Sequence, residues 1–416
     1  MLTILRKPEL TLLLLFLAAG SAADTDFGGH GKLRGVANAL PGDSIIRTVA
    51  PSVPFDAEGE LRLNFKASGG AWRAEAAYSL FLLHGDRVAY RRDLADGVPL
   101  YPDDETRLLD LTHVFEDSGK RLALHRMDRL AIGYTSDDFV IRLGRQVLSW
   151  GNGLFFSSLD LVNPFDPAAI DTEYKTGDDM LYAQRLFETG NDLQAALVVR
   201  RKPDTGNVSS SRSSALLKYH AFIGASELDI LFGKHYDEPV FGLGLARSVG
   251  GAVIRSDVSV TDSGGGYKTR FLLNGSLSWI AFGKNMSGSV EYFYSGFGLG
   301  DDDVLTTDVA ANAELSEQLL RGDLFNIGRH YLAGNVLVEM TPLLSVTPTL
   351  FTNLSDGSAL FQLIGQYSLS DNSVLLGSLN VPVGPPGTEF GGLKVPLTNL
   401  EFSAGPGIFL QLAGYF

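Results

Sequence analysis

Apolar and polar residues alternate along most of this chain, and turn-forming residues interrupt the alternation at short intervals. In residues 270–279 one face is apolar and carries Phe271, Leu273, Leu277 and Trp279. The other face of this run is polar and carries Arg270, Asn274, Ser276 and Ser278. The same split recurs in 193–199 and in 359–369. A two-residue period predicts β-strands, and strands with one apolar and one polar face are typical of a membrane barrel around a water-filled lumen.

The last strand-like run of the chain ends on an aromatic residue, Phe416. Its apolar residues share one face and are Ile408, Leu410, Leu412 and Phe416. Gln411 lies on the opposite face, as expected if one side meets lipid and the other a lumen. A strand of a soluble β-sandwich would show a similar pattern, so this run alone leaves both folds open.

Residues 1–23 have the composition of a secretory signal peptide. Arg6 and Lys7 precede an apolar core, 10–17, that is too short to span a bilayer, and small residues precede Asp24. Cleavage is expected next to Asp24 or one or two residues earlier. The rest of the sequence has no apolar run long enough for a membrane-spanning helix, which excludes a helical inner-membrane protein.

The connections between the predicted strands separate by length when the strands are counted back from Phe416, placed on the periplasmic side. The short connections all fall on that side: 135–138, 188–192, 224–225, 250–251, 283–285, 341–342 and 370–372. The long connections all fall on the other side: 84–120, 151–179, 201–212, 298–328 and 383–404. Short periplasmic turns and long extracellular loops are the rule for outer-membrane barrels.

The sequence therefore predicts an all-β fold, a single transmembrane antiparallel β-barrel over 24–416 with about 18 strands, or about 16 if the first pair is misassigned. The first strand is expected near Lys32 and the last at Phe416. The run 108–115 resembles a strand, but a membrane strand there would break the count. We expect it in a loop that folds onto or into the barrel.

Composition supports this fold and narrows the partners. The chain is rich in Gly (47), Phe (25) and Tyr (14), and its mean hydropathy is slightly positive. The net charge of −14 argues against nucleic acid, whose phosphates attract clustered Lys and Arg. No Cys is present, which excludes disulfides, thiolate metal sites and a lipoprotein anchor. The expected partners are outer-membrane lipid, lipopolysaccharide and a small polar or anionic solute.

Many acids gather in segments with the composition of loops, such as 103–105, 178–179 and 301–303. We interpret these runs as a solvated loop surface. Bridging by divalent cations, to lipopolysaccharide or to a neighbouring loop, is the alternative.

One stretch is more specific than the rest of the chain. It begins with a Gly-Arg-Gln strand end at 144–146 and continues with Trp-Gly-x-Gly at 150–153, Asp160 and Asn-Pro at 163–164. On these residues the sequence resembles porin-like bacterial outer-membrane families that include alginate export channels and several uncharacterised barrels. The resemblance implies a porin-like barrel and, for the alginate channels, a polyanionic polysaccharide as the substrate.

The same stretch predicts a loop with one defined shape. Its glycines permit bulges or positive φ, and its X-Pro steps force extended or turned backbone. We expect 151–179 to fold into the lumen and narrow it, with a constriction formed by Arg142, Arg145, Gln146, Asp160, Asn163 and Asp166. A rigid surface hairpin is the alternative.

The polar side chains of 142–146 are expected to brace this loop through hydrogen bonds or salt bridges to Asp160 or Asp166. Arg145 is out of phase with Arg142 in a regular strand, so both can point inward only if a bulge forms at Gly144. Without a bulge, one of the two arginines would lie near the rim.

Further cations fall on the faces assigned to the lumen and include Arg62, Arg73, Arg200, Lys218, Arg255, Lys268 and Arg270. Fewer acids share these faces. Charged rings in a low-dielectric wall focus the electric field along a pore, so this excess would favour anionic solutes. The alternative is that the cations pair with wall acids and only stiffen the barrel.

The sequence shows few features of an enzyme active site. Its seven His residues show no metal-binding spacing, and the Gly-rich runs lack the following helix that a phosphate-binding loop needs. We therefore expect no catalytic, cofactor-binding or metal-binding residues. The sequence predicts a porin-like channel in the bacterial outer membrane for passive passage of small polar or anionic solutes, with oligosaccharides among the candidates. A barrel plugged by its own loops, serving as an envelope anchor or binding surface, is the alternative.

Overall fold

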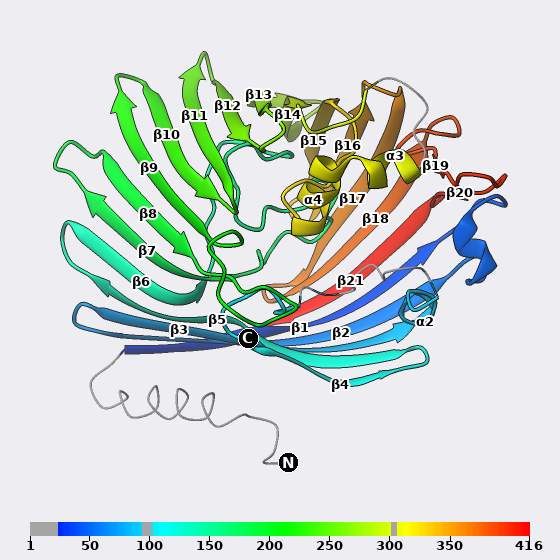
Figure 1. Cartoon of the computed structure of the whole chain (residues 1–416), viewed down its shortest axis with the longest axis horizontal. Helices are drawn as coiled ribbons and strands as arrows, with labels where there is room; N and C mark the ends of the chain where they lie inside the picture. The colour runs from blue at the N-terminus through cyan, green and yellow to red at the C-terminus, as the bar shows by residue number, and fades with distance from the viewer. Residues whose placement is uncertain (1–23, 94–100, 102, 301–305) are drawn as a thin grey trace.

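The structure is a computed structural model that describes residues 24–93, 101, 103–300 and 306–416. The predicted signal peptide, 1–23, and the acidic run 301–303 lie outside the described residues. The described chain forms one large antiparallel sheet whose first strand, β1 (Asp24–Asn38), pairs with its last, β21 (Gly407–Tyr415). The sheet therefore closes into a barrel (Figure 1). None of the helices in these ranges is long and apolar enough to cross a membrane.

The sheet has 19 strands in the described residues, and because one of them, β4, stands outside the closed wall, the wall has 18 strands. This confirms the predicted all-β barrel and its strand number. Besides β1 and β21, the wall consists of β2 (Phe55–Gly69), β3 (Trp72–Gly85), β5 (Arg121–Thr135), β6 (Phe139–Gln146), β7 (Asp178–Leu186), β8 (Asp192–Val198), β9 (Ser214–Ile223), β10 (Ser226–His235), β11 (Glu238–Val249), β12 (Ala252–Asp262), β13 (Tyr267–Ala281), β14 (Lys284–Ser295), β15 (His330–Thr341), β16 (Leu344–Asn353), β17 (Ser358–Ser370) and β18 (Ser373–Val383).

Small elements occupy the loops. They are the helices η1 (Ile45–Thr48), α2 (Asp86–Tyr90), α3 (Thr306–Ala311) and α4 (Ala313–Arg321), and the two-stranded pair β19 (Leu393–Lys394) and β20 (Glu401–Phe402). Each is too short to form a separate domain.

Inner and outer faces alternate along each wall strand. Asn274 of β13 lies opposite Glu291 of β14, and both side chains are buried on the inner side. The neighbouring Leu273 points outward with 45% of its surface exposed. Exposed apolar side chains recur around the outer face at Leu33, Leu61, Ile132, Leu350 and Leu410, and they form the surface that lipid requires. The fold fits a location in the bacterial outer membrane.

Connection lengths separate between the two ends of the barrel, as predicted. At one end the turns are all short: 70–71, 136–138, 187–191, 224–225, 250–251, 282–283, 342–343 and 371–372. The opposite end carries the long connections 39–54, 86–120, 147–177, 199–213, 296–329 and 384–406, together with three short ones. The first end is the periplasmic end and the second the extracellular end of such a barrel.

The first strand is longer than predicted. It begins at Asp24 rather than near Lys32, and nearly all of it pairs with β2. The Gly-rich run 28–31 obscured this part of the strand in the sequence. A Cβ at Gly29 would lie 2.1 Å from the Arg62 carbonyl oxygen, so glycine is needed for the two backbones to approach.

The run 108–115 also differs from its prediction. Part of it forms the short strand β4 (Thr112–Ser118), which pairs with residues 121–126 of β5. The remaining part of that β5 edge, 130–135, pairs with β6. The run is therefore partly a strand rather than a loop, but β4 pairs only with the extracellular part of β5 and does not add a membrane strand.

Candidate functional site

The 147–177 segment leaves the wall after β6 and runs through the interior of the barrel before β7 begins (Figure 1). Two wall carboxylates hold its first part. Asp257 of β12 accepts hydrogen bonds from the backbone N–H (2.6 Å) and the side-chain amide (2.7 Å) of Asn152. Glu291 of β14 accepts from the backbone N–H groups of Leu154 and Phe156, each at 2.7 Å. These charge-assisted bonds fix residues 152–156 against this side of the wall.

The last part of the segment contacts a different side of the wall. Asp171 accepts a hydrogen bond from the Lys32 ammonium of β1 (2.7 Å). Glu173 accepts one from the Tyr415 hydroxyl of β21 (2.9 Å). In between, the Ala168 carbonyl accepts from the Gln362 amide of β17 (2.9 Å). Because these strands lie well apart from β12 and β14 around the barrel, the segment crosses the lumen.

Apolar side chains fill the interior next to β13, β14, β15 and β16. Phe156 stacks on Phe293, with ring centroids 4.8 Å apart, and lies 5.5 Å from the Tyr331 ring. The 296–329 loop adds Leu315 of α4 to the same buried cluster. This cluster buries apolar surface away from water, so any passage for polar solutes would lie elsewhere in the lumen.

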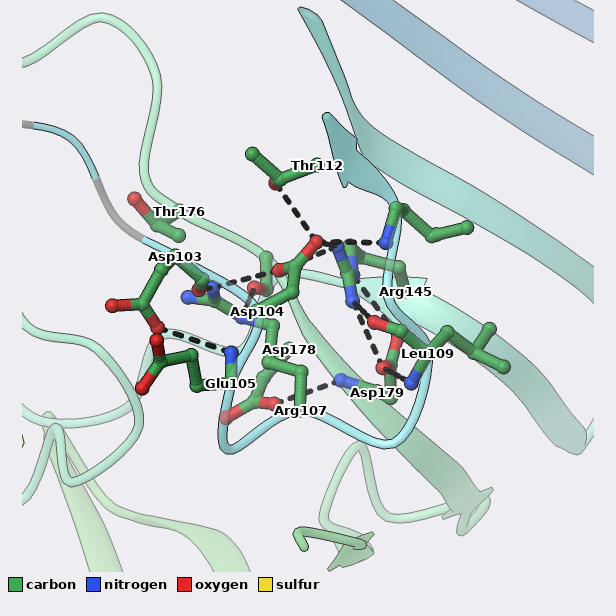
Figure 2. Close-up of polar contacts among 12 residues, drawn as sticks. Asp103, Asp104, Glu105, Arg107, Leu109, Thr112, Arg145, Thr176, Asp178 and Asp179 are labelled. Atoms are coloured by element: carbon green, nitrogen blue, oxygen red, sulfur yellow. Dashed lines mark hydrogen bonds and ion pairs between the residues drawn. The ribbon is translucent and has the colours of Figure 1, made fainter. Parts of the chain in front are cut away.

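Arg145 is the centre of a fully buried polar cluster at the extracellular end of β6 (Figure 2). Its guanidinium donates to both carboxylate oxygens of Asp104 (2.9 Å each) and to both oxygens of Asp179 (3.0 Å each). It also donates to the Leu109 carbonyl (2.6 Å). Burial alone would raise the pKa of Asp104, but the charges of Arg145 and Arg107 outweigh burial and lower it. The cluster joins the 103–111 loop to the ends of β6 and β7.

The partners expected for Arg145 were wrong. Asp160 lies instead against the Lys175 ammonium, with both carboxylate oxygens at 2.6 Å, and Asp166 accepts from the backbone N–H of Ala168 (2.8 Å). Burial raises the pKa of Asp160 to about 6, which the Lys175 charge partly opposes. The expectation failed because the loop supplies its own cation for Asp160, whereas Arg145 is satisfied by acids from elsewhere.

No bulge forms at Gly144, although a bulge was the condition for both arginines to point inward. The pairing of β6 with β5 and β7 runs through Gly144 without a register shift, but its φ is +120°. Leu143 faces outward and is 59% exposed, whereas Arg145 is fully buried. The Arg142 guanidinium lies over the Tyr182 ring, 4.5 Å from its centroid. Gly144 therefore has a backbone conformation available mainly to glycine, and Arg145 lies at the extracellular end of β6, where Asp104 and Leu109 of the 103–111 loop cover it.

The remaining predicted constriction residues are separated. Gln146 is buried and donates to the Met180 carbonyl (3.1 Å) in the neighbouring strand. Asn163 has a positive φ of +51°, and its side-chain amide lies 3.5 Å from the Thr176 carbonyl oxygen. The Asn163 contact lies within the 147–177 segment, whereas the Gln146 contact joins β6 to β7. The narrowing of a pore by this set stays a prediction.

Two cavities line the inner face of β2 and β3. One, of about 290 Å³, lies beside the 147–177 segment and is lined by Arg62, Arg126, Asp128, Asp171 and Tyr174, among others. The other, of about 320 Å³, lies closer to the periplasmic end and is lined by Asp24, Asp26, Lys66, Arg73, Glu75 and Arg142 together with Ile132 and several small residues. On β2, Arg62 lines the first cavity and Lys66 lines the second. The two cavities therefore follow one another along the wall.

Most of the predicted lumen cations have acidic partners. Three ion pairs connect strands of the wall or join it to a loop: Arg62 with Asp128 (2.8 Å), Arg200 with Asp178 (2.7 Å) and Lys218 with Asp229 (3.3 Å). Lys268 pairs with Glu314 of α4 (2.6 Å). Arg270 is buried and donates to the Asp323 carbonyl (3.3 Å), and Arg255 donates to Ser276 (3.0 Å).

The expectation of a basic lumen is therefore corrected for much of the wall, because acids of other wall strands and of α4 pair with these cations, as the alternative interpretation held. Arg73 differs from the paired cations. Together with Lys66 and Arg142, it has no ion pair within 4 Å among the residues that the structure describes, and all three line the periplasmic cavity.

Sequence reasoning missed Asp104, Asp179 and Lys175 as parts of this site. The acidic runs 103–105 and 178–179 were interpreted as solvated loop surface, but Asp104, Asp178 and Asp179 are buried. The position of residues 178–179 could have revealed their role, because they directly precede a predicted strand. They lie opposite the end of β6, with Asp179 opposite Arg145, once β6 and β7 pair.

We expect docking of the 384–406 loop onto the barrel to depend on pH through Glu389. This buried carboxyl accepts hydrogen bonds from the Tyr331 hydroxyl (2.6 Å) and the Asn353 amide (2.9 Å), and its own N–H donates to Asp356 (2.8 Å). Burial raises the pKa of Glu389 to about 7 from an ordinary 4.5. A raised pKa means that docking of the loop is strongest below about pH 4.5 and is weakened, by roughly 3 kcal/mol, as pH rises through 7.

Hydrogen–deuterium exchange of residues 384–392, corrected for the intrinsic pH effect, should be faster at pH 8 than at pH 6. Glu389→Gln should remove most of this difference, because the amide stays neutral. An equal pH dependence in the two proteins would assign the effect to another group.

One family model and several solved structures resemble this chain. A family model described as "Protein of unknown function (DUF1302)" matches residues 127–182, which include β6 and the 147–177 segment. The search of curated proteins found no match. The resemblance to alginate export channels stays unconfirmed.

Solved structures similar to the chain are outer-membrane porins and channels. They include Acinetobacter baumannii OccAB2 (10% identity, 94% of this chain and 98% of that chain, TM-score 0.53) and Pseudomonas aeruginosa OccK2 (OpdF) in complex with glucuronate (8%, 94% and 98%, 0.52). A BenF-like porin from Pseudomonas fluorescens Pf-5 is also similar (10%, 95% and 98%, 0.50). At such low identity the likeness concerns the fold: the chain is a closed antiparallel β-barrel of the porin type.

Proposed function

We propose that this protein is a passive outer-membrane channel for small polar or anionic solutes, with its passage along the inner face of β1, β2, β3, β5 and β6. The observation that carries this proposal is the division of the lumen. Loops and aromatic side chains fill the half next to β13, β14, β15 and β16, whereas charged cavities follow one another along β2 and β3. Polar walls that keep space for solute are what a hydrophilic channel needs.

The anionic preference rests on three cations of the periplasmic cavity. Lys66, Arg73 and Arg142 have long side chains, whereas the acids that share the cavity, Asp26 and Glu75 among them, are shorter. A long cationic side chain carries its charge farther from the wall than a carboxylate does. A solute in the passage would therefore meet positive charge first, which favours anions.

The fold comparison is consistent with this class of solute. OccK2 was solved in complex with glucuronate, a small sugar acid. Shared fold alone does not transfer a substrate, so this support is by analogy. The cavities, of about 290 and 320 Å³, fit solutes of monosaccharide size. An extension to oligosaccharides would require the chain to thread past the 147–177 segment.

A second candidate is a barrel plugged by its own loops that serves as an envelope anchor or binding surface. It is favoured by the number of contacts that fix the 147–177 segment to five wall strands, among them the Asn152–Asp257 and Asp171–Lys32 bonds. A loop held in this way cannot leave the lumen without losing several charge-assisted bonds at once.

Conductance across planar lipid bilayers separates the two candidates. The folded barrel, verified by its slower migration when heated on a gel, is expected to give stable openings in KCl. A correctly folded barrel that stays silent at moderate voltages would favour the plugged structural barrel and would contradict the channel.

A further inference from the structure

Two histidines face each other on the outer surface of the barrel. His113 of β4 and His125 of β5 occupy directly opposite positions of the antiparallel pair. Their ring centroids are 5.5 Å apart, with an interplanar angle of 59°. The neighbouring Val114 and Leu124 pack with Val88 on the inner side, so alternation places both imidazoles on the outer side. Cross-strand partners of this kind are close enough to act together.

The surroundings hold one imidazole and leave the other accessible. His125 is only 5% exposed and lies beside Tyr78 (5.5 Å) and Phe115 (6.4 Å between centroids). His113 is exposed. The next acid along β4, Glu116, is engaged with Arg121 at 3.0 Å. An incoming ion would therefore meet one buried imidazole and one exposed imidazole, and Glu116 is already held by Arg121.

We propose that His113 and His125 form a surface site for a divalent transition-metal ion of the Cu²⁺, Ni²⁺ or Zn²⁺ type. Imidazole is a preferred ligand of these ions, whereas Mg²⁺ and Ca²⁺ need oxygen ligands. Two ligand nitrogens at about 2 Å from one ion place their ring centroids about 5 to 5.5 Å apart. The observed separation of 5.5 Å fits this arrangement with small side-chain adjustments.

The site would be exchangeable rather than structural. Structural zinc sites use four protein ligands. No group of three or more His, Asp or Glu residues in the described parts of the chain could hold a metal, so water would complete the coordination here. A bound ion would join β4 to β5 and stabilise the extracellular strand pair. The sequence could not reveal the site, because its two residues lie on different strands and become neighbours only when β4 pairs.

Copper titration of the folded, full-length barrel in detergent tests the proposal, using protein without a polyhistidine tag. We expect one tight Cu²⁺ equivalent whose electron paramagnetic resonance spectrum shows two nitrogen ligands. His113→Ala should lose this equivalent, and because His113 is exposed the variant should fold normally. His125→Ala should also lose it.

His84→Ala is the matched control, since His84 is another exposed histidine at the end of the adjacent strand β3. This variant should bind copper as the unmodified protein does. Retention of the equivalent by His113→Ala, or a spectrum with a single nitrogen ligand, would overturn the proposal.

Discussion

Replacing Arg145 with Met should lower the free energy of unfolding of the barrel by roughly 3–5 kcal/mol, because it leaves the buried Asp179 without its arginine partner and the buried Asp104 with Arg107 alone. Asp104 and Asp179 each accept two bonds from this guanidinium, and neither has access to bulk water. The loss should be measurable by urea unfolding of the barrel in lipid vesicles. Adding Asp104→Asn and Asp179→Asn should recover part of it, because neutral amides cost less to bury.

Arg185→Met is the matched control for this experiment. Arg185 pairs with Asp138 at the same 3.0 Å distance, but the two side chains are 60% and 56% exposed. Exposed pairs contribute only about 0–1 kcal/mol. If Arg145→Met costs no more than Arg185→Met, the buried cluster does not stabilise the extracellular end of β6 as we infer.

The second large effect concerns the 147–177 segment. Replacing residues 154–168 with a short Gly-Ser linker should raise single-channel conductance severalfold while the barrel stays folded. The exchange removes Phe156 from the lumen and Ala168 from its contact with β17, so the segment no longer crosses the interior. Loops in a wide lumen limit pore radius more than they support the wall.

A loop deletion outside the lumen provides the control. Residues 203–206 form an exposed extracellular turn, closed by a hydrogen bond from the Gly206 N–H to the Lys202 carbonyl (2.8 Å). Removing them should leave conductance unchanged. Unchanged conductance in the 154–168 exchange, with a folded barrel, would mean that the segment does not limit the passage.

The wall of the barrel could be predicted from sequence because lipid imposes a local rule on each strand. Every second residue must be apolar, and the rule acts without reference to the rest of the chain. Leu273 and Asn274 illustrate it, since adjacent residues take opposite environments. The strand number followed from this pattern and from turn lengths. The start of β1 was misplaced because Gly28, Gly29 and Gly31 carry no side chain to show the alternation.

The interior could not be predicted to the same degree because its contacts join residues far apart in sequence. Arg145 pairs with Asp104 from a preceding loop, and Asp257 holds Asn152 from the other direction along the chain. No local pattern specifies such partners. The charge of the lumen was overestimated because acids on other strands and in α4, such as Asp178 and Glu314, neutralise wall cations.

The reversal potential of single channels in a KCl gradient tests the account most directly. The unmodified channel should favour chloride over potassium, because Lys66, Arg73 and Arg142 present positive charge in the passage. Lys66→Gln, Arg73→Gln and Arg142→Gln combined should abolish this preference, whereas Lys234→Gln, at the extracellular end of β10, should preserve it. A channel that favours potassium, or one whose selectivity is the same in the triple variant, would contradict a passage along this side of the wall.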